Sequence, residues 1–315
     1  MSFIPARNDP YQLVTDSIIA HLERGVVPWR CPWNRTTDRP RNFHTGREYH
    51  GVNVLLLGLL HFPSPWWMTF RQAQERVGSV RKGEHGALVM NFGRWDKAVK
   101  NGDGTEDKKT TLFLKSYRVF NATQIEGIEF PPVESGPQLD ASQRITRAEQ
   151  IVAQMPQPPT IGEGRTTRAC YRRQSDTIDM PAFARFDLPE SFHLTLFHEL
   201  IHSTGHQSRL ARKGVTESDG FGGKAYSQEE LVAEMGAAFL GMEAEIVRDQ
   251  HEQSAAYLQG WLDTLRVQDH RRWIVQAANY AGRAADFILG RSADDSSPAP
   301  VPEETAEQAA LPAAA

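Results

Sequence analysis

The five residues His198-Glu199-Leu200-Ile201-His202 spell H-E-x-x-H and decide the fold of the second half of the chain. On a helix, side chains four residues apart lie on one face, so both imidazoles can bind one zinc ion while Glu199 reaches the metal-bound water. The surrounding residues 189–205 predict that helix, because apolar side chains cover most of its circumference: Phe192, Leu194, Leu196, Phe197, Leu200 and Ile201. We therefore predict a buried helix with one polar strip, since a surface helix carrying two unrelated histidines would not be apolar on so many sides.

The ends of this helix carry further signals. Asp187 is a candidate N-cap, and Gly205 follows the second histidine as a stop.

The metzincin pattern requires a third histidine ten residues after His198, but Ser208 occupies that position, so this pattern fails. His206 is as good a candidate for a group that stabilises an oxyanion as for a metal ligand.

Residues 226–242 offer the third metal ligand. They read Y-S-Q-E-E-L-V-A-E-M-G-A-A-F-L-G-M, which predicts a helix with an apolar side and a side of small residues that allows close helix packing. A glutamate ligand followed one turn later by a carboxylate that orients a zinc histidine is the glutamate-zincin arrangement. We assign Glu230 as the ligand and Glu234 as the orienting carboxylate. The alternative is that Glu230 forms a capping box with Ser227 and that Glu229 is the ligand.

This predicted centre has the groups that peptide hydrolysis requires. Zinc, or another divalent metal such as manganese, would acidify its bound water and polarise a carbonyl, while Glu199 takes the proton of the water. Tyr226 and His206 are candidates for donating hydrogen bonds to the developing oxyanion.

The composition is that of an ordinary soluble chain. Of 315 residues, 40% are hydrophobic and 23% are charged, and the length predicts about two domains. No apolar run reaches the roughly 20 residues that cross a bilayer, and the first residues lack the hydrophobic segment of a signal peptide. The two cysteines, Cys31 and Cys170, lie far apart and indicate neither a disulfide framework nor a cysteine zinc site. We expect a cytoplasmic monomer with no membrane partner.

Charge and aromatic residues indicate an anionic partner for the first half. Residues 1–135 contain 18 Lys and Arg against 14 Asp and Glu, whereas the remaining residues contain 17 against 25. Five of the seven tryptophans also lie there, interleaved with arginines. Guanidinium groups for phosphates and aromatic faces for unstacked bases favour single-stranded DNA, and no motif for reading a duplex is evident. The candidate DNA-binding residues are Trp29, Arg30, Trp33, Arg35, Arg41, Arg47, Arg81 and Lys82.

The alternative is that the tryptophans are core residues and the arginines belong to a solvated loop. Trp66 and Trp67 fit this interpretation as well as they fit binding, whereas Trp29 and Trp33, in a proline-rich loop, are better binding candidates. The turn at 78–86, which reads G-S-V-R-K-G-E-H-G, lacks the spacing of a P-loop.

Together these segments predict an α+β protein in two parts. Residues 1–130 form a mixed α/β domain that binds single-stranded DNA, with strands at 87–95 and 111–120 separated by a polar loop at 97–109. Residues 131–138 form a linker. Residues 139–290 form a mainly helical, zincin-like metallopeptidase domain with a small sheet, and the Ala- and Pro-rich residues 291–315 are expected to be disordered.

Longer stretches resemble one known family. In the first half they are Y-Q-L-V-T-D-S-I-I-A-H-L-E-R-G-V-V-P-W from Tyr11, R-N-F-H-T-G-R-E-Y-H-G-V-N from Arg41, W-M-T-F-R-Q-A from Trp67, V-R-K-G-E-H-G from Val80 and Y-R-V-F-N-A-T-Q-I from Tyr117. In the second half they are F-H-E-L-I-H-S-T-G-H-Q-S-R-L from Phe197 and Y-S-Q-E-E-L-V-A-E-M-G-A-A-F-L from Tyr226. Together they closely resemble the ArdC-type antirestriction proteins of conjugative plasmids.

The resemblance covers residues 11–289. It implies a domain that binds single-stranded DNA, joined to a zinc-peptidase-like domain, in a protein that helps an incoming plasmid escape host restriction. It also implies that His198 and His202 are metal ligands, that Glu199 is the catalytic base, and that the E-E-L-V-A-E segment supplies the third ligand.

Two other functions fit parts of the sequence. One is a DNA-binding accessory factor whose metal is structural or whose peptidase is inactive, although a structural zinc has no use for a general base such as Glu199. The other is a peptidase whose first domain binds protein substrates instead of DNA. The sequence does not indicate the protein or peptide target.

Overall fold

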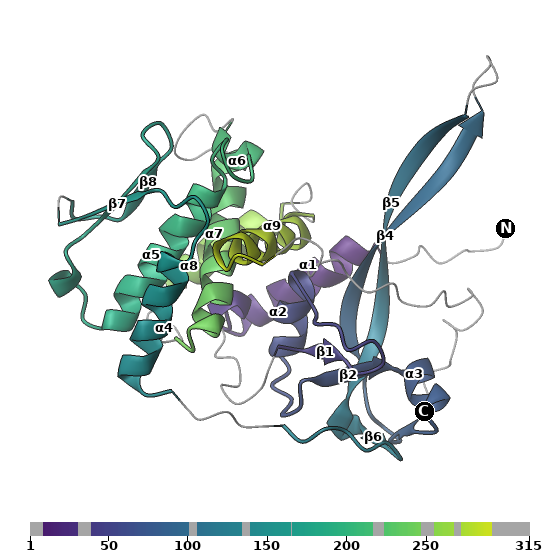
Figure 1. Ribbon diagram of the computed structural model, residues 1–315. Coiled ribbons are helices and arrows are strands. Elements are labelled where there is room, and N and C mark those ends of the chain that lie inside the picture. Colours follow the sequence, from purple (N-terminus) through teal and green to yellow (C-terminus); the bar gives the residue numbers. More distant parts are fainter. Residues whose placement is uncertain are drawn as a thin grey trace.

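Figure 1 shows the computed structural model of the protein. It describes residues 9–30, 39–100, 106–133, 139–164, 166–216, 224–246, 255–267 and 272–291. The predicted α+β class is confirmed, with the main strands of the first half on one side and most helices of the second half packed together on the other (Figure 1).

The first half is built on a four-stranded sheet with the order β1-β2-β5-β4. β1 runs parallel to β2, and the other neighbours are antiparallel. β3 and β6 form a separate antiparallel pair. The strands are β1 (Arg41–Asn42), β2 (Trp66–Thr69), β3 (Ser79–Val80), β4 (Ala87–Lys100), β5 (Glu106–Asn121) and β6 (Ile125–Glu126).

β4 and β5 form a long hairpin that projects from the body of the protein (Figure 1). Their pairing runs without interruption from Ala87 opposite Val119 to Lys100 opposite Glu106. The strands predicted at 87–95 and 111–120 are therefore present, but the loop predicted at 97–109 was wrong for 97–100 and 106–109. Polar residues have low strand propensity, yet a regular antiparallel ladder overrides that weak preference.

Short helices connect and cover these strands. α1 begins where the side chain of Asp9 accepts a hydrogen bond from the Tyr11 N–H at 3.0 Å. Asn53 on α2 fixes that helix to β4, because its side chain bonds the N–H and the carbonyl of Met90 at 2.7 and 2.8 Å. The elements are α1 (Pro10–Glu23), the 3-10 turn η1 (Pro28–Arg30), α2 (Val52–Gly58), α3 (Phe70–Glu75) and the 3-10 turn η2 (Ala122–Gln124).

The second half combines a helix bundle with a three-stranded sheet of order β7-β9-β8. β9 is central, with β7 parallel and β8 antiparallel to it, so β8 is an edge strand. The elements are α4 (Ala141–Ala153), β7 (Thr160–Glu163), β8 (Cys170–Arg172), β9 (Thr177–Met180), the 3-10 turn η3 (Phe183–Arg185), α5 (Pro189–Thr204), α6 (Lys213–Thr216), α7 (Lys224–Glu243), α8 (Ala255–Leu265) and α9 (Trp273–Ile288).

α5 is the buried helix that the H-E-x-x-H segment predicts. Its apolar residues are all buried as expected: Phe192, Leu194, Leu196, Phe197, Leu200 and Ile201. The helix stops at Gly205 as predicted, but its N-cap is Leu188 and no side chain caps it, so the prediction for Asp187 was wrong. α7 begins at Lys224, so Ser227 lies inside its first turn and is not the N-cap that the capping-box alternative requires.

One hydrophobic core joins the two halves. Val14 and Ile18 of α1 and Leu55 of α2 belong to the same buried cluster as residues of α5, α7 and α9. Two smaller clusters lie under the sheet of the first half. The domain boundaries stay predictions, and most of the predicted linker and nearly all of the predicted tail lie outside the described residues. Within the part of the chain that is described, no helix is both long and apolar enough to cross a bilayer.

Gly236→Ala should destabilise the protein, because a Cβ at this position of α7 would lie 2.6 Å from Cδ1 of Ile201 on α5. We expect the free energy of unfolding, measured by urea titration, to fall by about 1–3 kcal/mol. Gly260→Ala on α8 is the matched control, since nothing lies within 4 Å of a Cβ there. Alanine should leave its stability unchanged or raise it by up to about 1 kcal/mol. Equal stability of the two variants would contradict the close approach of α5 and α7.

Candidate metal centre

Three side chains from two packed helices converge on one point. α5 presents His198 and His202, and α7 presents Glu230. The Nε2 atoms of the two histidines are 3.1 Å apart, and the Glu230 carboxylate oxygens lie 3.5 Å from His198 Nε2 and 3.3 Å from His202 Nε2. The structure therefore brings together the three residues predicted as metal ligands.

This donor set fits a divalent transition metal. Around a tetrahedral zinc with ligand bonds of about 2.1 Å, neighbouring ligand atoms lie roughly 3.4 Å apart, close to the three separations observed here. Two imidazole nitrogens and one carboxylate oxygen also make up the ligand chemistry of a catalytic zinc site that keeps a coordination position for water. His198, His202 and Glu230 would hold the ion.

Glu229, one residue before the candidate ligand, contacts the other side of His202. Its Oε1 lies 3.5 Å from His202 Nδ1, and the Glu229 side chain is 7% exposed. Arg212 donates to both oxygens of this carboxylate. This contact places Glu229 where it can orient the ring of His202. Glu234, predicted for this role, is half-buried one turn further along α7, and its function stays a prediction.

The charges of these groups suit a cation. Burial alone would lower the pKa of His202, but the neighbouring carboxylates of Glu229 and Glu230 raise it to about 10. Burial would raise the pKa of both glutamates, yet His202 with Arg212 holds the pKa of Glu229 low, and His198 with His202 holds the pKa of Glu230 low. Both carboxylates are therefore ionised, and a bound metal would replace the proton of His202.

Glu199 lies on α5 between the two histidines and is 8% exposed. Its Oε2 accepts a hydrogen bond of 2.8 Å from the backbone N–H of Tyr171 on the edge strand β8. That bond fixes the direction of the carboxylate and leaves its other oxygen for a second partner. The arrangement suits a general base held beside a metal.

Arg209 holds β8 against α5. Its buried guanidinium donates to the Ser203 carbonyl at 2.7 Å, to the Tyr171 hydroxyl at 3.3 Å and to both carboxylate oxygens of Asp176. Arg209 keeps the pKa of Asp176 below its ordinary value. Sequence reasoning missed Arg209 and Arg212, although both lie in the R-L-A-R segment that follows α5.

His206 and Tyr226 are the two residues predicted to donate hydrogen bonds to the developing oxyanion. His206 lies just beyond the end of α5, where its Nδ1 is 2.8 Å from the Ser208 hydroxyl. Tyr226 lies in the first turn of α7, but its side chain is outside the described residues. Their roles therefore stay predictions.

The structure corrects one predicted DNA-binding residue. Trp29 is 1% exposed, packs edge-to-face on Trp261 at 5.5 Å, and donates its indole N–H to the Tyr257 hydroxyl at 3.3 Å. It is a core residue, because the loop that carries it folds against α8. Trp33, Arg35 and the side chain of Arg30 lie outside the described residues.

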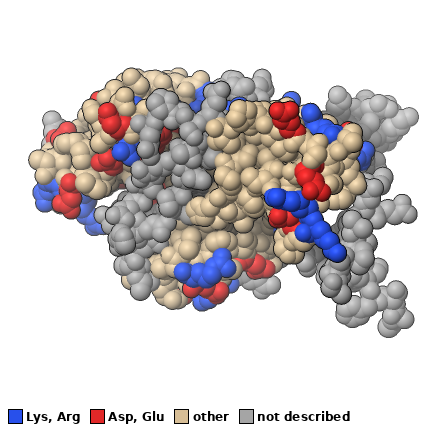
Figure 2. Space-filling model, turned by 90° about the horizontal axis from the view of Figure 1, so that it is seen from below, with Lys and Arg blue, Asp and Glu red and all other residues tan. Residues whose placement is uncertain are grey.

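The other predicted DNA-binding residues lie in the first half. Arg41 is half-buried and pairs with Glu48 at 2.8 Å. Arg47, Arg81 and Lys82 are exposed. On the face that Figure 2 shows, basic side chains alternate with acidic ones instead of forming one continuous basic surface.

Sequence reasoning also missed an aromatic cluster in this half. Phe43 packs on Trp66 at 5.6 Å and on Phe130 at 4.7 Å between ring centroids, and the Arg76 guanidinium lies 4.9 Å from the Phe43 ring. All three rings are only half-buried. Trp67, by contrast, is 2% exposed and belongs to the core.

Comparison with known proteins assigns a class to each half. Residues 146–280 match the model of a zincin-like metallopeptidase, and residues 8–120 match the model of the N-terminal domain of the anti-restriction factor ArdC. The chain therefore joins a zincin-like metallopeptidase fold to an ArdC-type N-terminal domain.

Two crystal structures of the antirestriction protein ArdC from plasmid R388 have the same fold. The metal-free one is 36% identical, with a TM-score of 0.69, and the match covers 89% of this chain and 97% of that one. The Mn(II)-bound one is 36% identical, with a TM-score of 0.67, and the match covers 90% and 97%. This chain belongs to the ArdC family of antirestriction proteins, which confirms the resemblance seen in the sequence.

Curated relatives extend the comparison. Protein y4eC of Sinorhizobium fredii is 33% identical, with 91% of this chain and 93% of that protein covered. The Escherichia coli DNA primase TraC is also 33% identical over 96% of this chain, but this chain spans 29% of the length of that primase.

Glu230→Gln and Glu229→Gln should separate the metal ligand from the carboxylate that orients His202. Loss of the Glu229 charge should weaken zinc binding about 10- to 100-fold, because His202 stays in place but loses its ionic partner. Loss of the Glu230 charge should weaken it further, because a ligand is removed. Zinc affinity measured by competition with a chelator checks this, with circular dichroism as the control for folding. The reverse order would assign Glu229 as the ligand.

Proposed function

We propose that this protein is an antirestriction factor that binds single-stranded DNA through its first half and hydrolyses peptide bonds at a metal centre in its second half. The observation that carries the peptidase assignment is the convergence of His198, His202 and Glu230, with Glu199 held beside them on the same helix. A structural metal site needs no such base. Action on incoming plasmid DNA would take place in the cytoplasm of the recipient cell.

The proposed chemistry assigns one task to each side chain. His198, His202 and Glu230 hold a divalent metal that, when bound, supplies Lewis acidity to the carbonyl and to a water molecule. Glu199 takes a proton from the attacking water and returns it to the leaving amine. The Tyr171 N–H keeps Glu199 aimed, and Glu229 keeps the His202 ring oriented. His206 and Tyr226 would donate to the developing oxyanion.

Zinc is the proposed physiological metal. Imidazole and carboxylate ligands with separations near those of a tetrahedron suit zinc. The Mn(II)-bound structure of the R388 relative supports manganese as the alternative, since the same ligand types accept both ions.

Glu199→Gln should abolish hydrolysis of a casein or peptide-library substrate while the protein still binds about one zinc per chain. The amide keeps the shape of the side chain and can still accept the Tyr171 hydrogen bond, but it cannot take a proton. We expect the rate to fall by at least about 100-fold, measured by fluorescence of quenched peptides. A variant that retains both zinc and full activity would remove Glu199 as the base. If this variant lost its zinc as well, the amide would have disturbed the metal ligands, and the loss of activity would not identify Glu199 as the base.

The aromatic cluster of Phe43, Trp66 and Phe130 supports the proposal that the first half binds single-stranded DNA. Half-exposed rings provide faces on which unstacked bases can stack, and arginine beside them can pair with phosphates. Arg76 lies against this cluster. A first half that recognises protein substrates is the competing function, and the salt dependence of binding separates the two because counterion release requires phosphates.

The triple variant Arg47→Gln, Arg81→Gln, Lys82→Gln should bind a fluorescent oligo-dT more weakly than the wild type. The slope of log affinity against log salt should fall by about 0.7 for each phosphate that the variant no longer neutralises, so by roughly 2 in total. Arg185→Gln, an exposed arginine in the second half, is the control and should change neither quantity. Trp66→Ala should weaken binding by about 1–3 kcal/mol with an unchanged slope, because it removes stacking and no charge. A triple variant with unchanged affinity would move the DNA site elsewhere.

A further inference from the structure

Arg209 joins α5, the helix of the two metal histidines, to the small sheet beside it. Its side chain is 1% exposed and makes five hydrogen bonds, one for each N–H group that an arginine side chain offers. The acceptors are the carbonyl of Ser203 on α5, the carbonyl of Gln157 before β7, the hydroxyl of Tyr171 on β8, and both carboxylate oxygens of Asp176 in the turn between β8 and β9. One buried cation therefore ties α5 to three segments of the sheet region.

The edge strand β8 depends on side chains for its position. It contains only three residues, Cys170–Arg172, and β9 pairs with one side of it. A ladder this short contributes few backbone hydrogen bonds, so side-chain contacts decide how firmly the strand is held. Tyr171 supplies two such contacts, because its hydroxyl donates to Asp176 at 2.9 Å and accepts from Arg209 at 3.3 Å.

The same residue of β8 holds the proposed general base. The backbone N–H of Tyr171 donates to Oε2 of Glu199 at 2.8 Å, while the ring of Tyr171 is anchored by Arg209. Because the N–H and the ring belong to one residue, loss of the anchor on the ring would free the backbone that carries the N–H. A continuous series of hydrogen bonds therefore runs from Arg209 through Tyr171 to Glu199.

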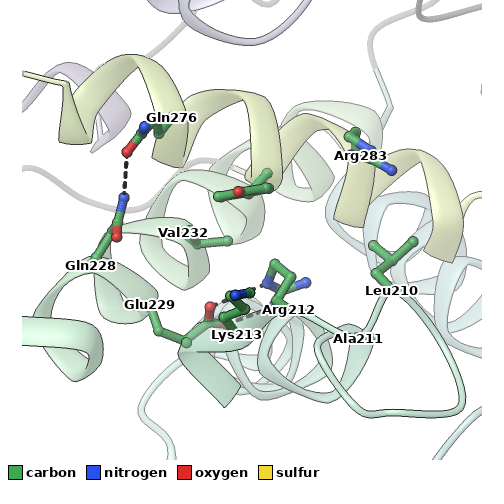
Figure 3. Close-up of a pocket in the computed structure, with 11 residues that line it drawn as sticks. Leu210, Ala211, Arg212, Lys213, Gln228, Glu229, Val232, Gln276 and Arg283 are labelled. Atoms are coloured by element: carbon green, nitrogen blue, oxygen red, sulfur yellow. Dashed lines mark hydrogen bonds and ion pairs between the residues drawn. The ribbon is translucent and has the colours of Figure 1, made fainter. Parts of the chain in front are cut away.

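Arg212, three residues further along the chain, acts on a different part of the centre. It lines a cavity of about 400 Å³ between α6, α7 and α9 and donates to both oxygens of Glu229 (Figure 3). Glu229 in turn contacts the candidate ligand His202. Arg209 has no N–H left for these groups, since its five bonds go elsewhere. The arginine on the side of the base and the arginine on the side of the ligands can therefore be tested separately.

We infer that Arg209 is a positioning residue for the general base: by anchoring Tyr171, it keeps the backbone N–H of β8 on the carboxylate of Glu199. Its effect on the rate of hydrolysis rests on the proposed peptidase function, whereas the anchor itself does not. Loss of Arg209 should impair the base and leave the metal ligands in place, which distinguishes this role from that of Arg212.

Amide hydrogen exchange of the metal-free full chain, followed residue by residue by NMR, tests the anchor without a substrate. Glu199→Ala should raise the exchange rate of the Tyr171 amide at least about tenfold, because it removes the acceptor. Arg209→Gln should raise the same rate by a similar factor. The Gly164 amide, which donates to the Met180 carbonyl at 2.9 Å elsewhere in the sheet, should keep its rate in both variants.

Two further variants sharpen this measurement. Tyr171→Phe removes only the hydroxyl that accepts from Arg209 and keeps the backbone N–H, so it should raise the exchange rate of the residue 171 amide by a smaller factor. Arg172→Gln is the matched control, because it removes an exposed ion pair with Asp179 on the same strand and should change neither rate. Circular dichroism checks folding, and where it shows Arg209→Gln to be unfolded, the Tyr171→Phe result decides.

Hydrolysis of the quenched peptides tests the consequence for catalysis. Arg209→Gln should lower kcat about 10- to 100-fold, the cost of a small misplacement of a reacting group, while KM and zinc affinity stay unchanged. A wild type that cleaves no peptide would contradict the proposed peptidase function but not the anchor, which amide exchange tests alone.

Four results would overturn the inference. The first is a residue 171 amide that keeps its exchange rate in both Arg209→Gln and Tyr171→Phe. The second is a Gly164 amide that accelerates as much as the Tyr171 amide, because Arg209 would then only stabilise the sheet. The third is an active Arg209→Gln variant with the kcat of the wild type, and the fourth is a folded Arg209→Gln variant that no longer binds zinc.

Discussion

The packing of α5 against α7 is the constraint on which the metal centre depends. The two histidines come from one helix and the glutamate from the other, so the distance between the helices sets the distance between ligands. A glycine at position 236 lets the helices approach until the Ile201 side chain fills the space of a missing Cβ. Leu200, Leu231 and Met235 are fully buried in the same core and hold that spacing. Van der Waals packing therefore fixes the geometry of polar groups.

A buried ionic chain adds orientation to this spacing. Arg212, 5% exposed, reaches the Ile201 carbonyl, the Thr204 hydroxyl and Glu229, and Glu229 in turn contacts His202. Ion pairs in the interior contribute little net stability, because desolvation offsets most of their attraction. The Arg212–Glu229 pair instead orients the ring of His202. The ring is held so that its Nε2 atom faces His198 and Glu230.

Sequence reasoning identified the helices of this centre because their signals are local. The apolar arc around His198 and the E-E-L-V-A-E segment each indicate a helix and a ligand within a few residues. It misjudged Trp29 because a proline-rich loop looks exposed until α8, more than 200 residues away, is folded against it. It did not foresee the contact of Glu229 with His202, because neighbouring carboxylates on a helix differ only in their angle around the helix axis. That angle depends on how α7 is rotated against α5, which no local pattern records.

The shared core also bears on how the two halves work together. Trp29, Val14 and Ile18 come from the half that matches the ArdC N-terminal domain, yet they pack against helices of the metallopeptidase half. Separating the halves would expose this apolar surface to water, at a cost of about 25 cal/mol for each Å². The primase relative, of which this chain spans 29%, contains both halves together. The hydrophobic core that both halves share gives a physical reason for them to stay together, as they do in that longer relative.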